Sequence, residues 1–290
     1  MKKCIFTGVC TALVTPFLDG KVNYPMVQQL LRRQIEAGIT AVVLAGTTGE
    51  ASTLSDNEKE TLFKLGKEWC GNKCTIIAGT GSNATEHAIE LSIAAEEAGA
   101  DALLIVSPYY NKATPDGLFA HYLSIAHKVH IPIIIYNVPS RTGVDIPVSV
   151  YKRLSQVPNI IGVKEASSDI TKITKIRAQC PEDFFIWSGN DDQIVPAMSL
   201  GCKGIISVLS NICPEETILM AGSALNGDFD TASALQCKLL PLIELLFCEV
   251  NPIPVKEVLK KIGYDCGYCR LPLCSLSREN QTKLDSFFTK

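Results

Sequence analysis

Residues 102–137 of this chain read ALLIVSPYYNKATPDGLFAHYLSIAHKVHIPIIIYN. Two continuous apolar runs, Leu103-Leu104-Ile105-Val106 and Ile133-Ile134-Ile135-Tyr136, flank an amphipathic segment. Continuous rather than alternating runs are typical of strands that are buried on both faces, as in a parallel sheet. The stretch therefore predicts a strand, a helix and a second, parallel strand.

The same succession continues along the whole chain. The clearest helical segment covers residues 83–98, where Ala84, Ala88, Leu91 and Ala95 form one apolar stripe. Eight strands spaced by roughly 20–35 residues, each followed by a helical stretch, are typical of an α/β fold of the (β/α)8 barrel type. The candidate strands are residues 9–14, 41–45, 75–78, 102–106, 132–137, 160–165, 185–188 and 204–208.

The eight units end near residue 225, which predicts a barrel over residues 1–224 and a C-terminal helical domain over residues 225–290. The C-terminal part shows helical periods over 232–250, 254–262 and 278–288 and no convincing strand. A doubly wound open sheet is the alternative architecture. It is disfavoured because such a fold usually has a glycine-rich dinucleotide turn after its first strand, and here the first strand ends in Thr15-Pro16-Phe17.

Composition excludes several classes of protein. Of the 290 residues, 47% are hydrophobic and 20% are charged, as expected for a folded globule rather than a disordered chain. The net charge of −3 and the lack of a Lys/Arg run argue against nucleic acid or an anionic membrane as a partner. The apolar runs are too short for a membrane span, and the first is better explained as a buried strand than as a signal peptide.

The twelve cysteines are the unusual feature of the composition. They are scattered through a large apolar chain, whereas a disulfide scaffold concentrates them in a short secreted one, so we expect reduced thiols in the cytoplasm. Cys266, Cys269 and Cys274 lie close together in sequence, but a fourth zinc ligand is missing nearby. The sequence therefore predicts no metal site.

Polar residues gather where the predicted strands end, which is where barrel enzymes carry their chemistry. Lys164 ends an apolar run, and a lysine in an apolar pocket can act as a free amine that forms a Schiff base with a ketone. Alternatively, Lys164 reaches solvent or pairs with Glu165. The strand-end segments are residues 46–50, 79–83, 107–111, 136–143, 164–165, 188–191 and 206–207.

Other strand-end residues fit the same chemistry. The phenol of Tyr136 is suited to relay protons to and from a lysine adduct, although an aromatic cap on the barrel core is an equal alternative. Arg141 is suited to bind a carboxylate, or is a solvated loop residue. The turn Gly46-Thr47-Thr48-Gly49 offers N–H groups and hydroxyls to a small anion, or serves only as a strand-to-helix turn. Packing at an interface is the favoured interpretation of Tyr109-Tyr110.

Taken together, these segments resemble the dihydrodipicolinate synthase family of class I pyruvate lyases. The resemblance covers essentially the whole chain. Its ordered motifs are Gly46-Thr47-Thr48-Gly49-Glu50, Pro108-Tyr109-Tyr110, Tyr136-Asn137-Val138-Pro139-Ser140-Arg141-Thr142-Gly143, Val163-Lys164-Glu165-Ala166 and Ser188-Gly189, followed by Asn251-Pro252-Ile253-Pro254-Val255-Lys256 and Arg270-Leu271-Pro272-Leu273.

The resemblance implies a mechanism. Lys164 would form an imine with pyruvate, and Tyr136 would act as the general acid and base that gives the enamine, which adds to the aldehyde of aspartate semialdehyde. Thr47 would link Tyr136 to Tyr110 in a proton relay. No metal or organic cofactor is needed, because the lysine imine is itself the electron sink.

The resemblance also implies how the substrates are held. Thr48 would hold the pyruvate carboxylate, and Arg141 would hold the carboxylate of the second substrate. Gly189 and Ile206 would line the pocket through their backbone groups. In relatives the equivalent of Tyr110 enters from the neighbouring subunit, and the family is usually a homotetramer built from two tight dimers.

Other activities within this family, and a non-catalytic role beyond it, remain as alternatives. Related barrels cleave sialic acid, 2-keto-3-deoxy-sugar acids or 4-hydroxy-2-oxoglutarate, but Thr47-Thr48 and Arg141 match the synthase pattern. A non-catalytic relative would be expected to lack Lys164, Tyr136 or Tyr110. For regulation, Asn83 and Tyr109 match the lysine pocket of sensitive relatives, whereas other positions depart from it, so we expect weak or absent inhibition by lysine. The departing residues are Ala51, Ser52, Asp56, Lys59 and His87.

Overall fold

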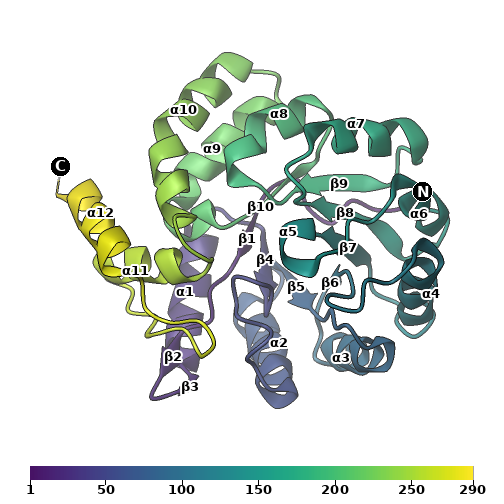
Figure 1. The fold of residues 1–290 in the computed structure, drawn as a ribbon, viewed down its shortest axis with the longest axis horizontal. Coiled ribbons are helices and arrows are strands. Elements are labelled where there is room, and N and C mark those ends of the chain that lie inside the picture. The colour runs from purple at the N-terminus through teal and green to yellow at the C-terminus, as the bar shows by residue number, and fades with distance from the viewer. Residues whose placement is uncertain (290) are drawn as a thin grey trace.

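The computed structural model describes residues 1–289 and contains a closed barrel of eight parallel strands surrounded by helices (Figure 1). Around the barrel the strand order is β1-β10-β9-β8-β7-β6-β5-β4, and β1 closes the ring by pairing with both β10 and β4. The predicted (β/α)8 barrel is therefore confirmed. The strands are β1 (Gly8–Ala12), β4 (Ala41–Leu44), β5 (Thr75–Gly79), β6 (Ala102–Val106), β7 (Ile133–Asn137), β8 (Ile160–Glu165), β9 (Phe185–Ser188) and β10 (Gly204–Ser207).

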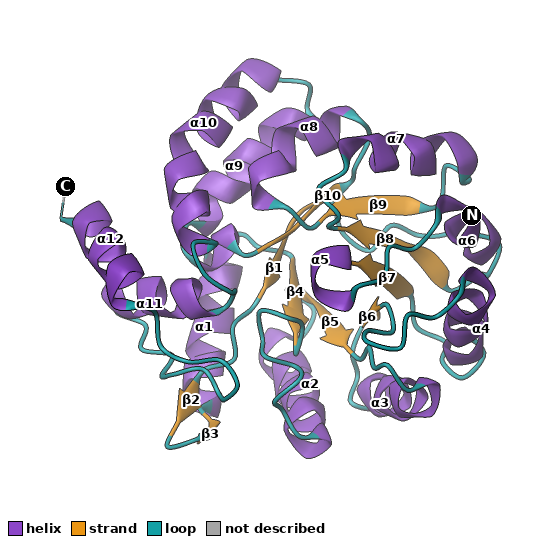
Figure 2. Cartoon of the chain, in the orientation of Figure 1, coloured by secondary structure: helices purple, strands orange, loops and turns teal. Residues whose placement is uncertain are grey.

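Helices alternate with the strands and cover the outside of the barrel (Figure 2). Three short helices follow strand ends: α5 (Pro139–Thr142) and the 3-10 turns η1 (Asp191–Gln193) and η2 (Leu209–Asn211). The covering helices are α1 (Tyr24–Glu36), α2 (Asp56–Cys70), α3 (Thr85–Glu97), α4 (Pro115–Ala126), α6 (Val148–Leu154), α7 (Ile170–Gln179), α8 (Ile194–Ser199) and α9 (Pro214–Leu225).

The C-terminal part is helical, as predicted, and consists of α10 (Phe229–Leu246), α11 (Ile253–Lys261) and α12 (Arg278–Phe288). The helix predicted over residues 232–250 begins and ends later in the chain than α10 does. Helix α10 begins earlier because the Asp228 side chain caps it by accepting the N–H of Thr231 at 3.1 Å. One small element was not foreseen: the hairpin of β2 (Phe17–Leu18) and β3 (Lys21–Val22), whose strands are too short to show an apolar pattern.

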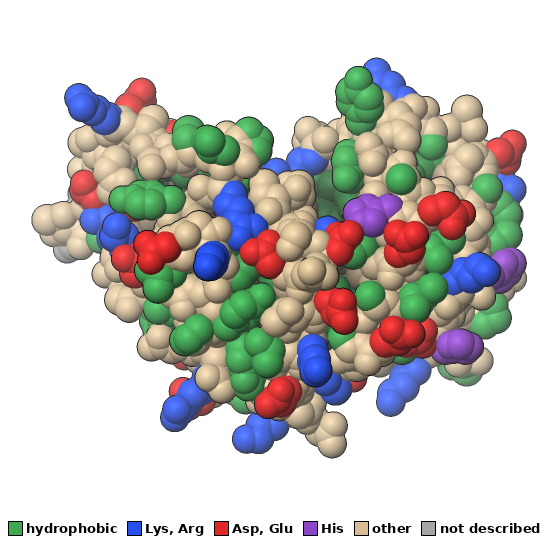
Figure 3. Space-filling view, turned by 90° about the horizontal axis from the view of Figure 1, so that it is seen from below, with side chains coloured by type: hydrophobic (Ala, Val, Ile, Leu, Met, Phe, Trp, Pro, Cys, Tyr) green, Lys and Arg blue, Asp and Glu red, His purple; other side chains and the backbone are tan. Residues whose placement is uncertain are grey.

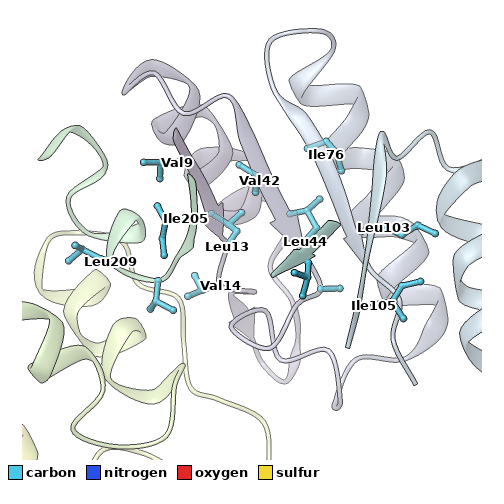
Figure 4. Close-up of a cluster of buried hydrophobic side chains, with 14 of the residues drawn as sticks. Val9, Leu13, Val14, Val42, Leu44, Ile76, Leu103, Ile105, Ile205 and Leu209 are labelled. Atoms are coloured by element: carbon cyan, nitrogen blue, oxygen red, sulfur yellow. The ribbon is translucent and has the colours of Figure 1, made fainter. Parts of the chain in front are cut away.

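Each barrel strand is apolar along its length because both of its faces are buried. On β4, Ala41 and Val43 belong to the cluster that fills the barrel with Trp187, whereas Val42 and Leu44 belong to the cluster beneath the helices. The period of two along a strand sends neighbouring side chains to opposite faces. Figure 4 shows the outer cluster, to which β1, β4, β5, β6 and β10 all contribute, with labelled side chains that include Val9, Val42, Leu44, Ile76, Leu103, Ile105 and Ile205.

A buried ion pair ties the loop after β4 to helix α11. The Glu50 carboxylate lies 2.5 Å from Lys256 Nζ, and both side chains are almost fully buried. The other oxygen of Glu50 accepts the backbone N–H of Arg270 at 2.9 Å, and Lys256 Nζ lies 4.3 Å from the centre of the Phe17 ring. Removing either charge would leave the other buried without compensation, which costs about 3–5 kcal/mol. This pair therefore fixes where the C-terminal segment sits beside the Thr47-Thr48 turn.

The face of the molecule seen in Figure 3 carries no dominant charge. Figure 3 shows acidic and basic side chains lying among one another on one face, in keeping with the net charge of −3. Within residues 1–289, helices are either too short or too polar to cross a membrane.

His121 of α4 links stability to pH. It is 4% exposed, its Nδ1 lies 3.0 Å from the Thr85 hydroxyl, and its Nε2 is buried with no partner among the described residues. Burial lowers the pKa of His121 to about 4. The native state therefore keeps this imidazole neutral at a pH where the unfolded chain binds a proton.

We expect the free energy of unfolding to fall as the pH drops from about 6.5 towards 4, because only the unfolded state gains the His121 proton in that window. Between about pH 7 and pH 5 the loss should be about 2 kcal/mol. Urea unfolding at the two pH values measures it. His121→Gln should remove most of the loss, whereas His130→Gln, at an exposed position, should keep it; equal losses in all three proteins would contradict this prediction.

Candidate active site

A cavity of about 490 Å³ opens at the carboxyl end of the barrel strands. This is the end where a parallel barrel places residues of chemical interest. The structure brings together here most of the site residues predicted from the sequence: Thr47, Thr48, Tyr136, Arg141, Lys164 and Gly189 all line this cavity.

Lys164 and Tyr136 lie side by side on paired strands. They are register partners of β8 and β7, and Lys164 Nζ lies 4.4 Å from the centre of the Tyr136 ring. Lys164 is 6% exposed and Tyr136 is 7% exposed. A largely buried primary amine with a phenol beside it has the two groups needed to attack a carbonyl and to move the protons involved.

Lys164 does not pair with Glu165, which was the alternative interpretation. The two side chains point to opposite faces of β8, because neighbours on a strand alternate. The Glu165 carboxylate is bound instead by the Asn137 amide at 2.9 and 3.1 Å and by the Ser167 N–H at 2.8 Å, and Lys172 Nζ lies 3.9 Å away. Glu165 therefore braces β7 against β8 from outside and leaves the Lys164 amine free of an ion pair with it.

Gly189, at the end of β9, leaves the space that Lys164 occupies. A Cβ atom at this position would lie 2.8 Å from Lys164 Cε and 2.6 Å from the Ala166 Cβ. Contacts this short do not occur without displacement of the neighbours. Ile206, the other residue expected at the pocket wall, lies instead in the fully buried cluster inside the barrel and is not among the residues that line the cavity.

Asn251 joins two of the predicted substrate-binding residues, although the sequence assigned it no role in the site. Its amide donates to the Thr48 hydroxyl at 2.9 Å, and its backbone carbonyl accepts from Arg141 at 3.2 Å. The Asn251 Oδ1 atom is buried without a partner among the described residues. A segment far along the chain thereby holds the two positions predicted to bind carboxylates.

Tyr110 is not brought to the cavity. Its side chain is 89% exposed, its backbone φ is +74°, and it lines neither this cavity nor its neighbour. Thr47 and Tyr136, the other two members of the predicted relay, both line the cavity. The predicted relay through these three residues is therefore not assembled within one chain.

A second cavity of about 440 Å³ adjoins the first, since Thr47, Tyr136 and Arg141 line both. Tyr109 lines this second cavity, whereas Asn83 does not; the Asn83 carbonyl accepts from the Asn111 amide at 2.8 Å.

Charged residues on the wall of the second cavity form a chain. The Asp56 carboxylate lies 3.3 Å from Lys59 Nζ and 3.0 Å from His87 Nε2. Burial alone would raise the pKa of Asp56, but the hydrogen bonds from His87 and Lys59 lower it overall. These contacts leave the Asp56 carboxylate engaged by its own neighbours.

Further residues that the sequence did not assign also line the first cavity. Asp191 of η1 and Phe247, which follows α10, both contribute to its wall. Asp191 lies in the predicted polar strand-end segment 188–191 without an assigned role, and Phe247 belongs to no pattern that distinguishes it from an ordinary helix-end residue. Across residues 1–289 we find no group of three or more His, Cys, Asp or Glu side chains placed to hold a metal ion, and all twelve cysteines there are free thiols.

Comparison with known proteins agrees with this geometry. Residues 5–290 match the Dihydrodipicolinate synthetase family. The 4-hydroxy-tetrahydrodipicolinate synthase of Acetivibrio thermocellus is 45% identical over 280 residues, which covers 97% of this chain and 95% of that protein. The protein of the same name from Fervidobacterium nodosum is 47% identical over 287 residues, which covers 99% of this chain and 98% of that protein.

Solved structures of similar proteins share the fold. Dihydrodipicolinate synthase from Aquifex aeolicus superposes with a TM-score of 0.96 at 41% identity, covering 98% of this chain and 97% of that one. The chloride-inhibited enzyme from Acinetobacter baumannii, complexed with pyruvate, superposes with a TM-score of 0.95 at 41% identity and covers 98% of both chains.

Gly189→Ala should reduce activity by about 100-fold or more while the protein stays folded, because the added methyl group displaces the Lys164 side chain. Steady-state rates and circular dichroism measure the two effects. Gly222→Ala is the matched control, since its Cβ would meet nothing within 4 Å. Full activity of Gly189→Ala would show that the added methyl group does not displace Lys164.

Proposed function

This chain belongs to the dihydrodipicolinate synthetase family, and we propose that it is a 4-hydroxy-tetrahydrodipicolinate synthase, a lyase (EC 4.3.3.7) that condenses pyruvate with L-aspartate 4-semialdehyde. This reaction is the first committed step of the diaminopimelate and lysine pathway. The observation that carries the proposal is the buried Lys164 amine beside the Tyr136 phenol at the wall of the barrel cavity.

The chemistry begins with an imine. The neutral Lys164 amine adds to the keto carbon of pyruvate, whose oxygen takes protons and leaves as water, and a protonated C=N bond remains. Tyr136, beside this nitrogen, supplies and accepts the protons. Loss of a proton from the pyruvate methyl group gives an enamine, because the protonated imine accepts the electron pair.

The enamine then forms the new carbon–carbon bond. Its terminal carbon attacks the aldehyde carbon of aspartate semialdehyde, and the aldehyde oxygen becomes a hydroxyl group. The amino group of the second substrate next displaces Lys164 from the imine carbon, which closes the ring and restores the free amine. The imine formed by the lysine is the only electron sink that these reaction steps require.

Two residues would hold the carboxylates of the substrates. Thr48, next to the backbone N–H groups of its turn, would bind the pyruvate carboxylate, and Arg141 would bind that of aspartate semialdehyde. Asn251 contacts both residues and would keep them at a fixed separation. Gly189 would give the pyruvate unit room above Lys164.

An oligomer completes the proposal. Tyr110 is almost fully exposed, and Leu271, at 82% exposed, is another large apolar side chain left to solvent in the single chain. We infer that a second copy covers the exposed Tyr110 and that Tyr110 enters the partner's cavity, where it meets Thr47, in a homotetramer made of two such dimers. Apolar and aromatic side chains of this kind are enriched in protein interfaces.

The remaining parts of the proposal concern domains and compartment. Residues 225–290 would form a helical domain that packs on the barrel of residues 1–224 and supplies Ile243, Glu244 and Phe247 to the cavity wall. Twelve free thiols suit the reducing environment of the cytoplasm.

Incubation with pyruvate followed by borohydride should attach one reduced pyruvyl group per chain, and peptide mapping should place it on Lys164. Lys164→Arg should form no adduct and should lower the rate of condensation by about 1000-fold or more. Aspartate semialdehyde should be consumed faster than sialate or 2-keto-3-deoxygluconate is cleaved. An unmodified Lys164, or faster cleavage of a sugar acid, would reject the proposed reaction.

Mixing two inactive variants should test whether Tyr110 acts across the dimer. Lys164→Ala and Tyr110→Ala subunits, dissociated and reassembled together, should regain roughly a quarter of the wild-type activity, because half of the dimers are hybrids with one complete site of two. No recovery, despite hybrids detected by mass spectrometry, would show that Tyr110 does not act in the partner's site.

A further inference from the structure

Asp191 is a buried carboxylate at the active-site cavity for which neither the sequence nor the proposed chemistry supplies a task. It is the first residue of η1, two residues after Gly189, and it belongs to the cavity lining. Its exposed fraction is only 1%. A carboxylate is rarely buried to this extent unless its environment stabilises the charge or uses it.

One oxygen of Asp191 is fully engaged, and the other is not. Oδ2 accepts the backbone N–H groups of Val208 and Leu209, both at 2.9 Å, and so fixes the turn that follows β10. The Gln236 amide donates to the Asp191 carbonyl at 2.9 Å and holds the main chain. Oδ1 is buried and has no hydrogen-bond partner among the described residues. The carboxylate is thus rigidly anchored through one oxygen only.

Asp191 and Lys164 line the same cavity. Burial raises the pKa of Asp191, and the Ser207 hydroxyl, the two backbone N–H groups and the Lys164 ammonium limit the rise. The two charges are not in contact, since no ion pair within 4 Å joins Asp191 to Lys164 in the described chain. Their interaction acts through a protein interior, where it is screened less than in water.

Few other groups compete for this role. Cys10 of β1 also faces Lys164 inside the barrel, but burial raises the pKa of its thiol, which therefore stays uncharged. Glu165 is turned away and is bound by Asn137. The remaining titratable groups on the cavity wall are Tyr136 of β7, Arg141 of α5, Asp192 of η1 and Glu244 of α10.

We propose that Asp191 is a positioning residue whose carboxylate is the fixed counter-charge of the Lys164 iminium. This inference rests on the proposed Schiff-base function. Water cannot stabilise the charge of a buried protonated imine. A negative charge that is held nearby therefore lowers the free energy of the imine. The anchor on Val208 and Leu209 prevents the carboxylate from collapsing onto the Lys164 amine before pyruvate arrives.

Asp191→Asn tests the negative charge of this residue apart from its hydrogen bonds to Val208 and Leu209. The amide oxygen can accept both backbone N–H groups in place of Oδ2, so the turn after β10 keeps its hydrogen bonds while the negative charge is lost. We expect the KM for pyruvate to rise by about tenfold, and the pH profile of kcat/KM for pyruvate to move down by about one pH unit, because the carboxylate no longer stabilises positive charge in the cavity.

A purely structural role predicts a different result. If Asp191 acted only through its hydrogen bonds to Val208 and Leu209, Asp191→Asn would keep them and would match the wild type in both the KM for pyruvate and the pH profile. The matched control Asp230→Asn removes the same charge from an exposed position of α10 that lines neither cavity, where water screens it, and should leave the profile in place. An Asp191→Asn profile that coincides with the wild-type profile would overturn the proposal.

A second measurement needs neither this variant nor any substrate. Isotope-edited infrared spectroscopy follows the buried Asp191 carboxyl in the wild-type protein and in Lys164→Met, and should show it titrating at higher pH in the variant. Identical titration curves would overturn the proposal even if Asp191→Asn did not fold. Failure of the Schiff-base function itself would appear separately, as an absence of borohydride-trapped pyruvate on wild-type Lys164.

Discussion

Closure of the barrel is the constraint on which the rest of this structure depends. With β1 paired to both β4 and β10, the sheet has no free edge, and side chains fill both its interior and its outer face. A charged group is then tolerated only where the strands end and the cavity begins. Lys164 occupies such a position, and Gly189 on the next strand leaves the space in which its side chain lies.

Much of the fold was predictable because its signals are local. The strands over 102–106, 160–165 and 185–188 agree with the predicted bounds, since each is a continuous apolar run with polar residues or turns on both sides. Strand ends that fall in apolar surroundings were placed less well: the first strand ends at Ala12, although the apolar run continues to Val14. The β2–β3 hairpin lacked any signal, because two residues per strand cannot show a period.

The site was predictable to the extent that it lies on strand ends. Lys164, Tyr136 and the Thr47-Thr48 turn could be placed together because parallel strands bring their carboxyl ends to one side of a barrel. The roles of Asn251 and Asp191 were not predictable, although Asp191 lies in the predicted strand-end segment 188–191. Their importance comes from partners that are distant in sequence, Thr48 in one case and the N–H groups after β10 in the other. Tyr110 is a different case. It is exposed in the single chain, and its proposed role requires a second copy of the chain.

The ion pair between Glu50 and Lys256 has a consequence for the history of the chain. Each charge is buried and each compensates the other, so a change at either position alone passes through a protein with an unpaired interior charge. Substitutions at these positions are therefore expected to become established together or not at all. The turn that holds Thr48 and the segment that carries Asn251 would accordingly be inherited as one unit, and recombination between homologues with a crossover between them would tend to be rejected by selection.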